Sequence, residues 1–182
     1  MNIYNYIEQM SSYINAKDWQ GLESNFKKNA EFLAGKEHAS EIAEVDLSSY
    51  QNSLCAKLSI AVEKARNSNA KAIYFEYDLD NDWQSYFFVC QNYNQQTIQN
   101  DDWACDWIDE LKGNDFSLFG DLYVTGFDST EVAKGVNLYL IARTIATFGR
   151  CCEMHQDNNF AICIAFHDQD PIMRIYEPII SN

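Results

Sequence analysis

The chain has 182 residues, 47% of them hydrophobic and 14% aromatic, and a formal net charge of −14. A chain of this length can bury about 70% of the surface that its unfolded form exposes, which is enough for a proper core. The negative charge excludes nucleic acid and anionic membranes as partners, because both would be repelled. We predict a single domain, residues 1–182, with a helical N-terminal part (1–69) and a sheet-containing body (70–182).

The N-terminal part has apolar residues at helical spacing. Two short amphipathic helices are predicted within residues 3–34, and Gly35 stands where a glycine commonly ends a helix. Residues 36–44 are polar and are predicted to form a link. A longer helix should follow, capped by Asp46 or Ser48.

The hydrophobic period changes to two at Ala72. Residues 72–77 and 85–90 are predicted to be strands, and the link 78–82 is rich in turn-forming residues. The two strands should pair as an antiparallel hairpin.

Residues 101–113 are predicted to form a short helix. Trp103, Trp107 and Leu111 recur every four residues, and Asp101 is a favourable N-cap. The spacing leaves open whether the two tryptophans belong to the core or are exposed.

The last third of the chain is predicted to complete the sheet. Residues 116–124 contain one or two short strands, and Asp128 with Glu131 resembles a capping box that opens a buried helix to about Phe148. A final hairpin is predicted from residues 160–167 and 172–175. These elements indicate an α+β fold, with N-terminal helices followed by a mainly antiparallel sheet and one buried helix packed on it.

The negative charge is concentrated in one stretch of the sequence. Between Asp78 and Glu131 there are twelve acids and one base, Lys112, so this stretch carries −11 of the net charge of −14. Such a field attracts a basic partner, and an aromatic anchor among the acids would supply binding energy. The residues predicted to bind this partner are Asp78, Asp80, Asp82, Trp83, Asp101, Asp102, Asp106, Asp109 and Glu110.

The sequence contains two weak indications of other chemistry. Asp78, Asp80 and Asp82 alternate as in a calcium-binding loop, but Trp83 and Val89 occupy the positions of its glycine and its last carboxylate. Cysteine nucleophiles could be proposed near histidines, although buried structural cysteine is the favoured interpretation. The pairs are Cys151 or Cys152 with His155, and Cys163 with His167. We predict no enzyme activity, no metal and no cofactor.

The cysteines and the N-terminus bear on the location of the protein. The six cysteines lack metal-site spacing, and the first ten residues lack the basic and apolar segments of a signal peptide. No apolar run approaches the roughly 18 residues of a membrane span. We predict a cytoplasmic protein with free, mostly buried thiols.

The stretch from Ala72 to Trp107 resembles a known class of proteins. After a helical N-terminal part come the strand AIYFEYD, an acidic turn with Trp83, the strand SYFFVC and the segment DWACDW. This order resembles immunity proteins of bacterial polymorphic and contact-dependent toxin systems. The resemblance implies a small acidic cytoplasmic protein that binds and neutralises a cognate toxin domain, often a basic nuclease.

Two alternatives to this function stay open at the level of the sequence. A small enzyme or ligand-binding domain would show a concave pocket with convergent polar groups and a perturbed carboxylate or thiol. A structural or regulatory subunit would associate mainly with itself.

Overall fold

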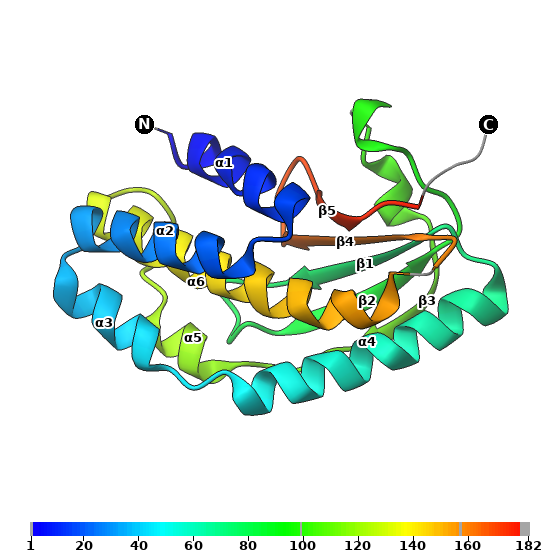
Figure 1. The fold of residues 1–182 in the computed structure, drawn as a ribbon, viewed down its shortest axis with the longest axis horizontal. Helices are drawn as coiled ribbons and strands as arrows, with labels where there is room; N and C mark the ends of the chain where they lie inside the picture. Colours follow the sequence, from blue (N-terminus) through cyan, green and yellow to red (C-terminus); the bar gives the residue numbers. More distant parts are fainter. Residues whose placement is uncertain (1, 99, 157, 179–182) are drawn as a thin grey trace.

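The structure is a computed structural model that describes residues 2–98, 100–156 and 158–178 (Figure 1). Its centre is a five-stranded sheet in the order β3-β2-β1-β4-β5. The strands are β1 (Ala72–Tyr77), β2 (Ser85–Cys90), β3 (Trp107–Lys112), β4 (Ala161–Phe166) and β5 (Met173–Tyr176). The helices are α1 (Ile3–Ala16), α2 (Trp19–Leu33), α3 (Lys36–Glu44), α4 (Ser48–Ser68), α5 (Ser117–Leu122) and α6 (Glu131–Cys152). The α+β fold class is therefore confirmed.

The N-terminal helices follow the predicted pattern with one correction. The predicted helices within 3–34 are α1 and α2, and Gly35 lies just beyond α2 with a φ of 94°. The predicted link 36–44 is wrong, because these residues form α3. Its apolar stripe consists of only Ala39 and Ile42, which are both buried and too few to stand out in a polar segment.

The predicted hairpin has the bounds expected from the alternation. β1 pairs antiparallel with β2, with Ala72 opposite Cys90 and Tyr77 opposite Ser85. β2 with β3 and β4 with β5 are also antiparallel, whereas β1 and β4 run parallel. The sheet is thus mixed but mainly antiparallel, and the final hairpin is confirmed.

Two local predictions in the body of the domain are wrong. Residues 101–113 form the short 3₁₀ helix η2 (Asp102–Cys105) and then β3, and residues 117–122 form α5 in place of strands. Pairing with the edge of β2 decides the conformation of residues 107–112, since tertiary context overrides weak helix propensity. Phe119 of α5 is completely buried and meets the ring of Trp83 edge to face at 5.5 Å.

Helix α6 is the central helix of the fold. It is buried along almost its whole length, between α2 and the sheet, and it runs to Cys152, beyond the predicted Phe148 (Figure 1). Its N-cap is Thr130, whose side chain accepts from the amide of Ala133, so the predicted Asp128 cap is wrong. In the part of the chain described, neither α6 nor another helix combines the length and apolarity needed to cross a membrane.

Close contact between α2 and α6 depends on a glycine. A Cβ atom added at Gly149 would lie 2.6 Å from the ring of Trp19, which packs directly on the backbone of α6. The indole of Trp19 also donates to a carboxylate oxygen of Glu153 at 2.6 Å. A larger residue at position 149 would push the two helices apart.

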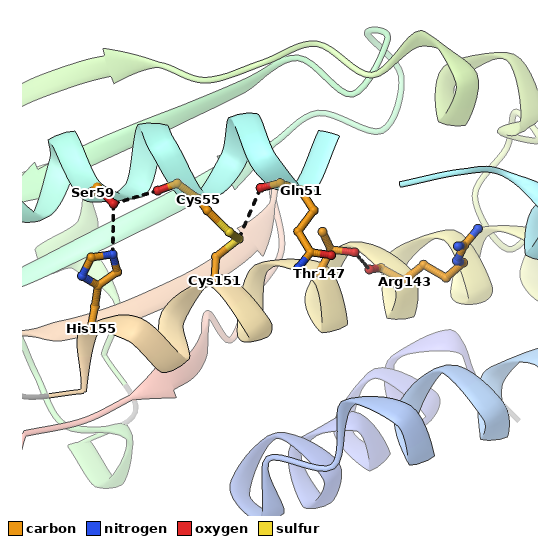
Figure 2. Close-up of a disulfide and its surroundings, with 7 residues drawn as sticks. All are labelled: Gln51, Cys55, Ser59, Arg143, Thr147, Cys151 and His155. Carbon is orange, nitrogen blue, oxygen red and sulfur yellow. Dashed lines mark hydrogen bonds between the residues drawn. A yellow bond between two sulfur atoms is a disulfide. The ribbon is translucent and has the colours of Figure 1, made fainter. Parts of the chain in front are cut away.

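One pair of cysteines departs from the prediction of free thiols. Cys55 of α4 and Cys151 of α6 form a disulfide, with their Cα atoms 4.9 Å apart (Figure 2). The pair is separated by 96 residues, so only the packing of both helices on one face of the sheet brings it together. The other cysteines are free, and of these Cys90, Cys152 and Cys163 are buried while Cys105 is exposed.

Candidate protein-binding face

The two faces of the sheet are covered differently. Strand alternation turns Ile73, Phe75 and Tyr77 toward the helices and turns Tyr74 and Glu76 to the other side. We call this second side the open face. By the strand registers it carries Ala72, Tyr74, Glu76, Tyr86, Phe88, Cys90, Glu110, Lys112, Ala161, Cys163, Ala165 and Arg174.

The loop between β2 and β3 covers one half of the open face. Trp103 is buried there and meets the ring of Tyr74 edge to face at 6.4 Å. Tyr93 packs on the other side of Trp103, with ring centroids 5.1 Å apart. These contacts make a small second core with Cys163 beneath it, separate from the core under the helices.

A buried arginine fixes this loop to the end of the sheet. The guanidinium of Arg174 lies 5.5 Å from the ring centroid of Trp103 and 5.8 Å from that of Tyr93. Its side chain is only 4% exposed, and it pairs with the carboxylate of Asp101, which also accepts from the amide of Ile172 at 2.8 Å. Burial acts to raise the pKa of Asp101, but the hydrogen bonds from Arg174 and Ile172 outweigh it and hold this pKa below its usual value.

The other half of the open face carries a row of aromatic rings, of which Tyr74 is buried, Tyr86 and Phe88 are half-buried and Trp107 is exposed. The ring of Phe88 lies 5.9 Å from Tyr74, 6.1 Å from Tyr86 and 5.6 Å from Trp107. We call these four residues the aromatic strip. Trp107 is 46% exposed, whereas Trp19, Trp83 and Trp103 are at most 5% exposed. Trp107 is thus the one tryptophan positioned to meet another molecule.

An acidic groove runs beside the aromatic strip. Its volume is about 560 Å³, and it lies between the segment 100–107 and the turn 168–172. Five carboxylates line it, together with Tyr74, Phe88 and Trp107. The carboxylates belong to Glu76, Asp101, Asp102, Asp168 and Asp170.

The groove has one titratable base at its border. Nδ1 of His167 lies 3.2 Å from a carboxylate oxygen of Glu76. This hydrogen bond, helped by the charges of Glu76 and Asp168, raises the pKa of His167 above its ordinary value. Since a single imidazole faces several carboxylates, the groove stays negative at neutral pH.

Three of the predicted partner-binding residues have internal roles. Trp83 is completely buried and donates to the hydroxyl of Thr144 at 2.9 Å, so it is unable to act as an exposed anchor. Asp109 faces away from the open face, toward α4, where its pairing with Lys64 at 2.5 Å lowers its pKa. The carboxylate of Asp101 forms an ion pair with the guanidinium of Arg174.

The remaining predicted residues divide between two places. Asp102 lines the acidic groove, Asp106 is exposed next to Trp107, and Glu110 projects from β3 on the open face. Asp78, Asp80 and Asp82 lie in the turn after β1, outside the groove. There the amide of Asp80 donates to Asp78 at 3.0 Å, and the carbonyl of Asp82 accepts from the amide of Phe116.

Sequence reasoning missed several residues of this face. Glu76, Asp168 and Asp170 line the acidic groove, and Tyr86 and Phe88 belong to the aromatic strip. Alternation within β1 and β2 carried part of the signal, because it sets Glu76 on the side opposite the core. Asp168 and Asp170 reach the acidic groove only because the chain returns to the open face after β4, and local sequence patterns do not predict this return.

The weaker sequence indications receive no support from the geometry. Among the described residues, no three His, Cys, Asp or Glu side chains gather as they would around a metal ion. Cys151 is held in the disulfide, and burial raises the pKa values of the Cys152 and Cys163 thiols well above the ordinary range. His155 hydrogen-bonds the hydroxyl of Ser59 at 3.2 Å (Figure 2).

Comparison with known proteins gives no relative for this chain. No family model matches it, and neither a curated protein nor a solved structure matches it. The charge, the exposed tryptophan and the groove of the open face are the features of this chain that bear on its function.

Proposed function

We propose that this protein is an immunity protein that binds and neutralises a cognate, basic bacterial toxin domain through its open face. The observation that carries the proposal is the exposed Trp107 next to the acidic groove, on a sheet face that the loop with η2 covers only in part. The resemblance of residues 72–107 to immunity proteins points to the same class.

Two physical effects support binding of a basic domain: electrostatic attraction at long range and apolar contact at short range. Carboxylates around the groove attract a basic surface over several ångströms and raise the association rate, an effect that salt screens. Trp107 and Phe88 offer apolar area of the kind that dominates binding energy at the centre of interfaces. In this account the protein blocks the toxin by covering it and contributes no chemistry.

The proposal can be tested by protection in cells. The domain encoded at the C-terminus of the reading frame directly upstream would be expressed with or without this protein, and growth would be recorded. We expect growth to be restored by the wild-type chain. A neighbouring frame that encodes no toxic domain, or toxicity that persists at high levels of this protein, would contradict the proposal.

A matched pair of variants tests the role of the open face. The open-face variant is Asp102→Lys, Asp106→Lys and Asp168→Lys, three exposed acids around the groove. The control variant is Glu37→Lys, Glu41→Lys and Glu44→Lys, which makes the same charge change on exposed positions of α3. Loss of three ion pairs with the toxin domain, at about 0.5 kcal/mol each, predicts at least about tenfold weaker binding for the open-face variant. The α3 control should still protect the cells.

A small-ligand function is a second candidate, favoured by one observation. A cleft of about 550 Å³ lies between α1 and residues 170–174, within the size range of small-molecule sites. Its lining includes Tyr4, Glu8 and Arg174. A thermal-shift screen of metabolites against the wild type and Glu8→Ala tests it, since a ligand of this cleft should stabilise only the wild type.

A further inference from the structure

One edge of the sheet is exposed along its full length. β3 is the last strand on its side and pairs only with β2 among the described strands. Trp107, Ile108, Glu110 and Lys112 are all exposed, and Trp107 and Ile108 present 46% and 44% of their surface. The opposite edge is closed, because the first three residues of β5 are buried and α1 packs beside it (Figure 1).

The register shows which backbone groups of β3 face outward. The amide of Gly113 donates to the carbonyl of Ser85 at 2.8 Å, and Leu111 and Asp109 lie opposite Phe87 and Val89. In an antiparallel pair the residues that exchange hydrogen bonds with the partner alternate with residues whose amides and carbonyls point away. Residues 109, 111 and 113 therefore pair with β2, and the backbones of residues 110 and 112 point to the outer edge. The register shifts between Val89 and Cys90, so this alternation ends at residue 109.

Outward backbone groups on an exposed edge are a template for another strand. This edge is continuous with the open face, because Trp107 belongs to the aromatic strip and Glu110 lies opposite Phe88. A strand added to β3 would place every second side chain against the aromatic strip and the acids beside it. Edge and face together form one binding surface.

The charge at the β3 edge favours a basic partner segment. Asp106 and Glu110 are exposed acids, and the only base of the strand, Lys112, lies 3.8 Å from Asp115. A second copy of the chain carries the same net charge of −14, so two copies repel each other. A basic extended segment meets no such repulsion, and it gains the apolar surface of Trp107 and Ile108.

We propose that β3 binds an extended basic segment of the partner by strand addition, which enlarges the sheet to six strands. The inference rests on the proposed function for the identity of the partner and specifies how that partner is held. Backbone hydrogen bonds along β3 supply the pairing, and basic side chains on one face of the added strand lie beside the exposed acids Asp106 and Glu110.

The test uses two synthetic peptides of equal charge. One alternates lysine and valine, and the other has the same sequence with N-methyl groups on a central lysine and a central valine, which block both of its edges. Trp107 is the exposed tryptophan of the four, so acrylamide quenching of tryptophan fluorescence reports occupancy. We expect the unmodified peptide to protect Trp107 and to slow amide exchange at residues 110 and 112, and the methylated peptide to bind at least about tenfold more weakly.

A matched pair of protein variants tests the same edge by changing β3 and leaving the peptide unmodified. Glu110→Pro and Glu110→Gln both remove the charge, but only proline removes an outward amide, and edge strands tolerate proline there. The proline variant should lose binding at least about tenfold while the glutamine variant retains it. If the proline variant does not fold, the two peptides and the exchange of the wild-type amides decide the question.

Three results would overturn strand addition. They are equal binding of both peptides, no binding of either one, and a native dimer that Glu110→Pro dissociates. The first two would leave the proposed function standing if the open-face charge variant still fails to protect against the toxin domain. Failure of the wild-type chain to protect against the toxin domain would remove the proposed function itself, whatever the peptides show.

Discussion

The disulfide between Cys55 and Cys151 makes a strong prediction about stability. It joins α4 to α6, the two long helices on the covered face of the sheet (Figure 2). The perturbation is the double substitution Cys55→Ala and Cys151→Ala, which removes the cross-link and leaves the free cysteines in place. Reduction of the wild-type protein should have the same effect.

The size of the effect follows from the length of chain that the disulfide closes. The sequence separation is 96 residues, and loss of loop-closure entropy in the unfolded chain predicts about 4.7 kcal/mol for a loop of this length. Removal of native disulfides typically costs about 2–5 kcal/mol, so we expect a loss in that range. For a chain of this size about 2–4 °C of Tm is lost per kcal/mol, which gives a fall of about 4–20 °C.

The assay is thermal unfolding of the wild type and the double variant, with and without reductant. Thiol titration of the unfolded wild-type protein should find the four free cysteines before reduction and all six afterwards. Cys105→Ser is the matched control, because Cys105 is free and exposed and its loss should leave Tm unchanged. A wild type whose Tm is insensitive to reductant and equal to that of the double variant would refute the reasoning.

Three further predictions concern the open face. Arg174→Leu leaves the carboxylate of Asp101 partly buried without its partner and should cost about 3–5 kcal/mol in urea unfolding, with part of the loss recovered when Asp101→Asn is added; no recovery would contradict the pairing. Because Glu76 raises the pKa of His167, this pair stabilises the fold fully below the ordinary histidine pKa and loses its effect as pH rises through the raised folded-state value. Glu76→Gln should therefore lower Tm more at about pH 5 than at about pH 8.5, and an equal loss at both would count against the pair. Trp107→Phe should remove most of the tryptophan fluorescence that acrylamide can quench, and unchanged quenching would show that Trp107 is shielded.

The parts of the fold that the sequence predicts well are those with one dominant period. β1 is apolar and buried on both sides, β2 alternates between buried and half-buried positions, and the bounds of both strands coincide with the prediction. α6 is apolar on almost all sides, which a buried helix requires. In these segments local propensity and burial point to the same structure.

The failures occur where two patterns fit the same residues. Trp103, Trp107 and Leu111 satisfy a four-residue helical repeat, but residues 107–112 can also pair as an edge strand. In that strand a register shift puts Trp107 on the open face, while Asp109 and Leu111 face the helices. The edge of β2 favours the strand, and Trp103 is left in a separate short turn over the open face. The choice between helix and strand depends on whether another strand is available for pairing, and the spacing of residues along the chain does not show this.

The candidate site shows the same limit. Local acid content identified Asp102, Asp106 and Glu110, which are exposed on or beside the open face. It also selected Trp83 and Asp109, which the fold uses in its core and in an ion pair with α4. Charge along the sequence indicates the sign of a surface, but only the fold decides which charged residues reach it.

The central claim is that the open face binds a basic toxin domain. The most direct measurement is the association rate and affinity of the upstream-encoded domain for the wild type, the open-face variant and the α3 control, each at low and high salt. The account predicts an association rate that falls with salt for the wild type and the α3 control, and binding at least about tenfold weaker for the open-face variant. Equal affinity for all three proteins, independent of salt, would contradict it.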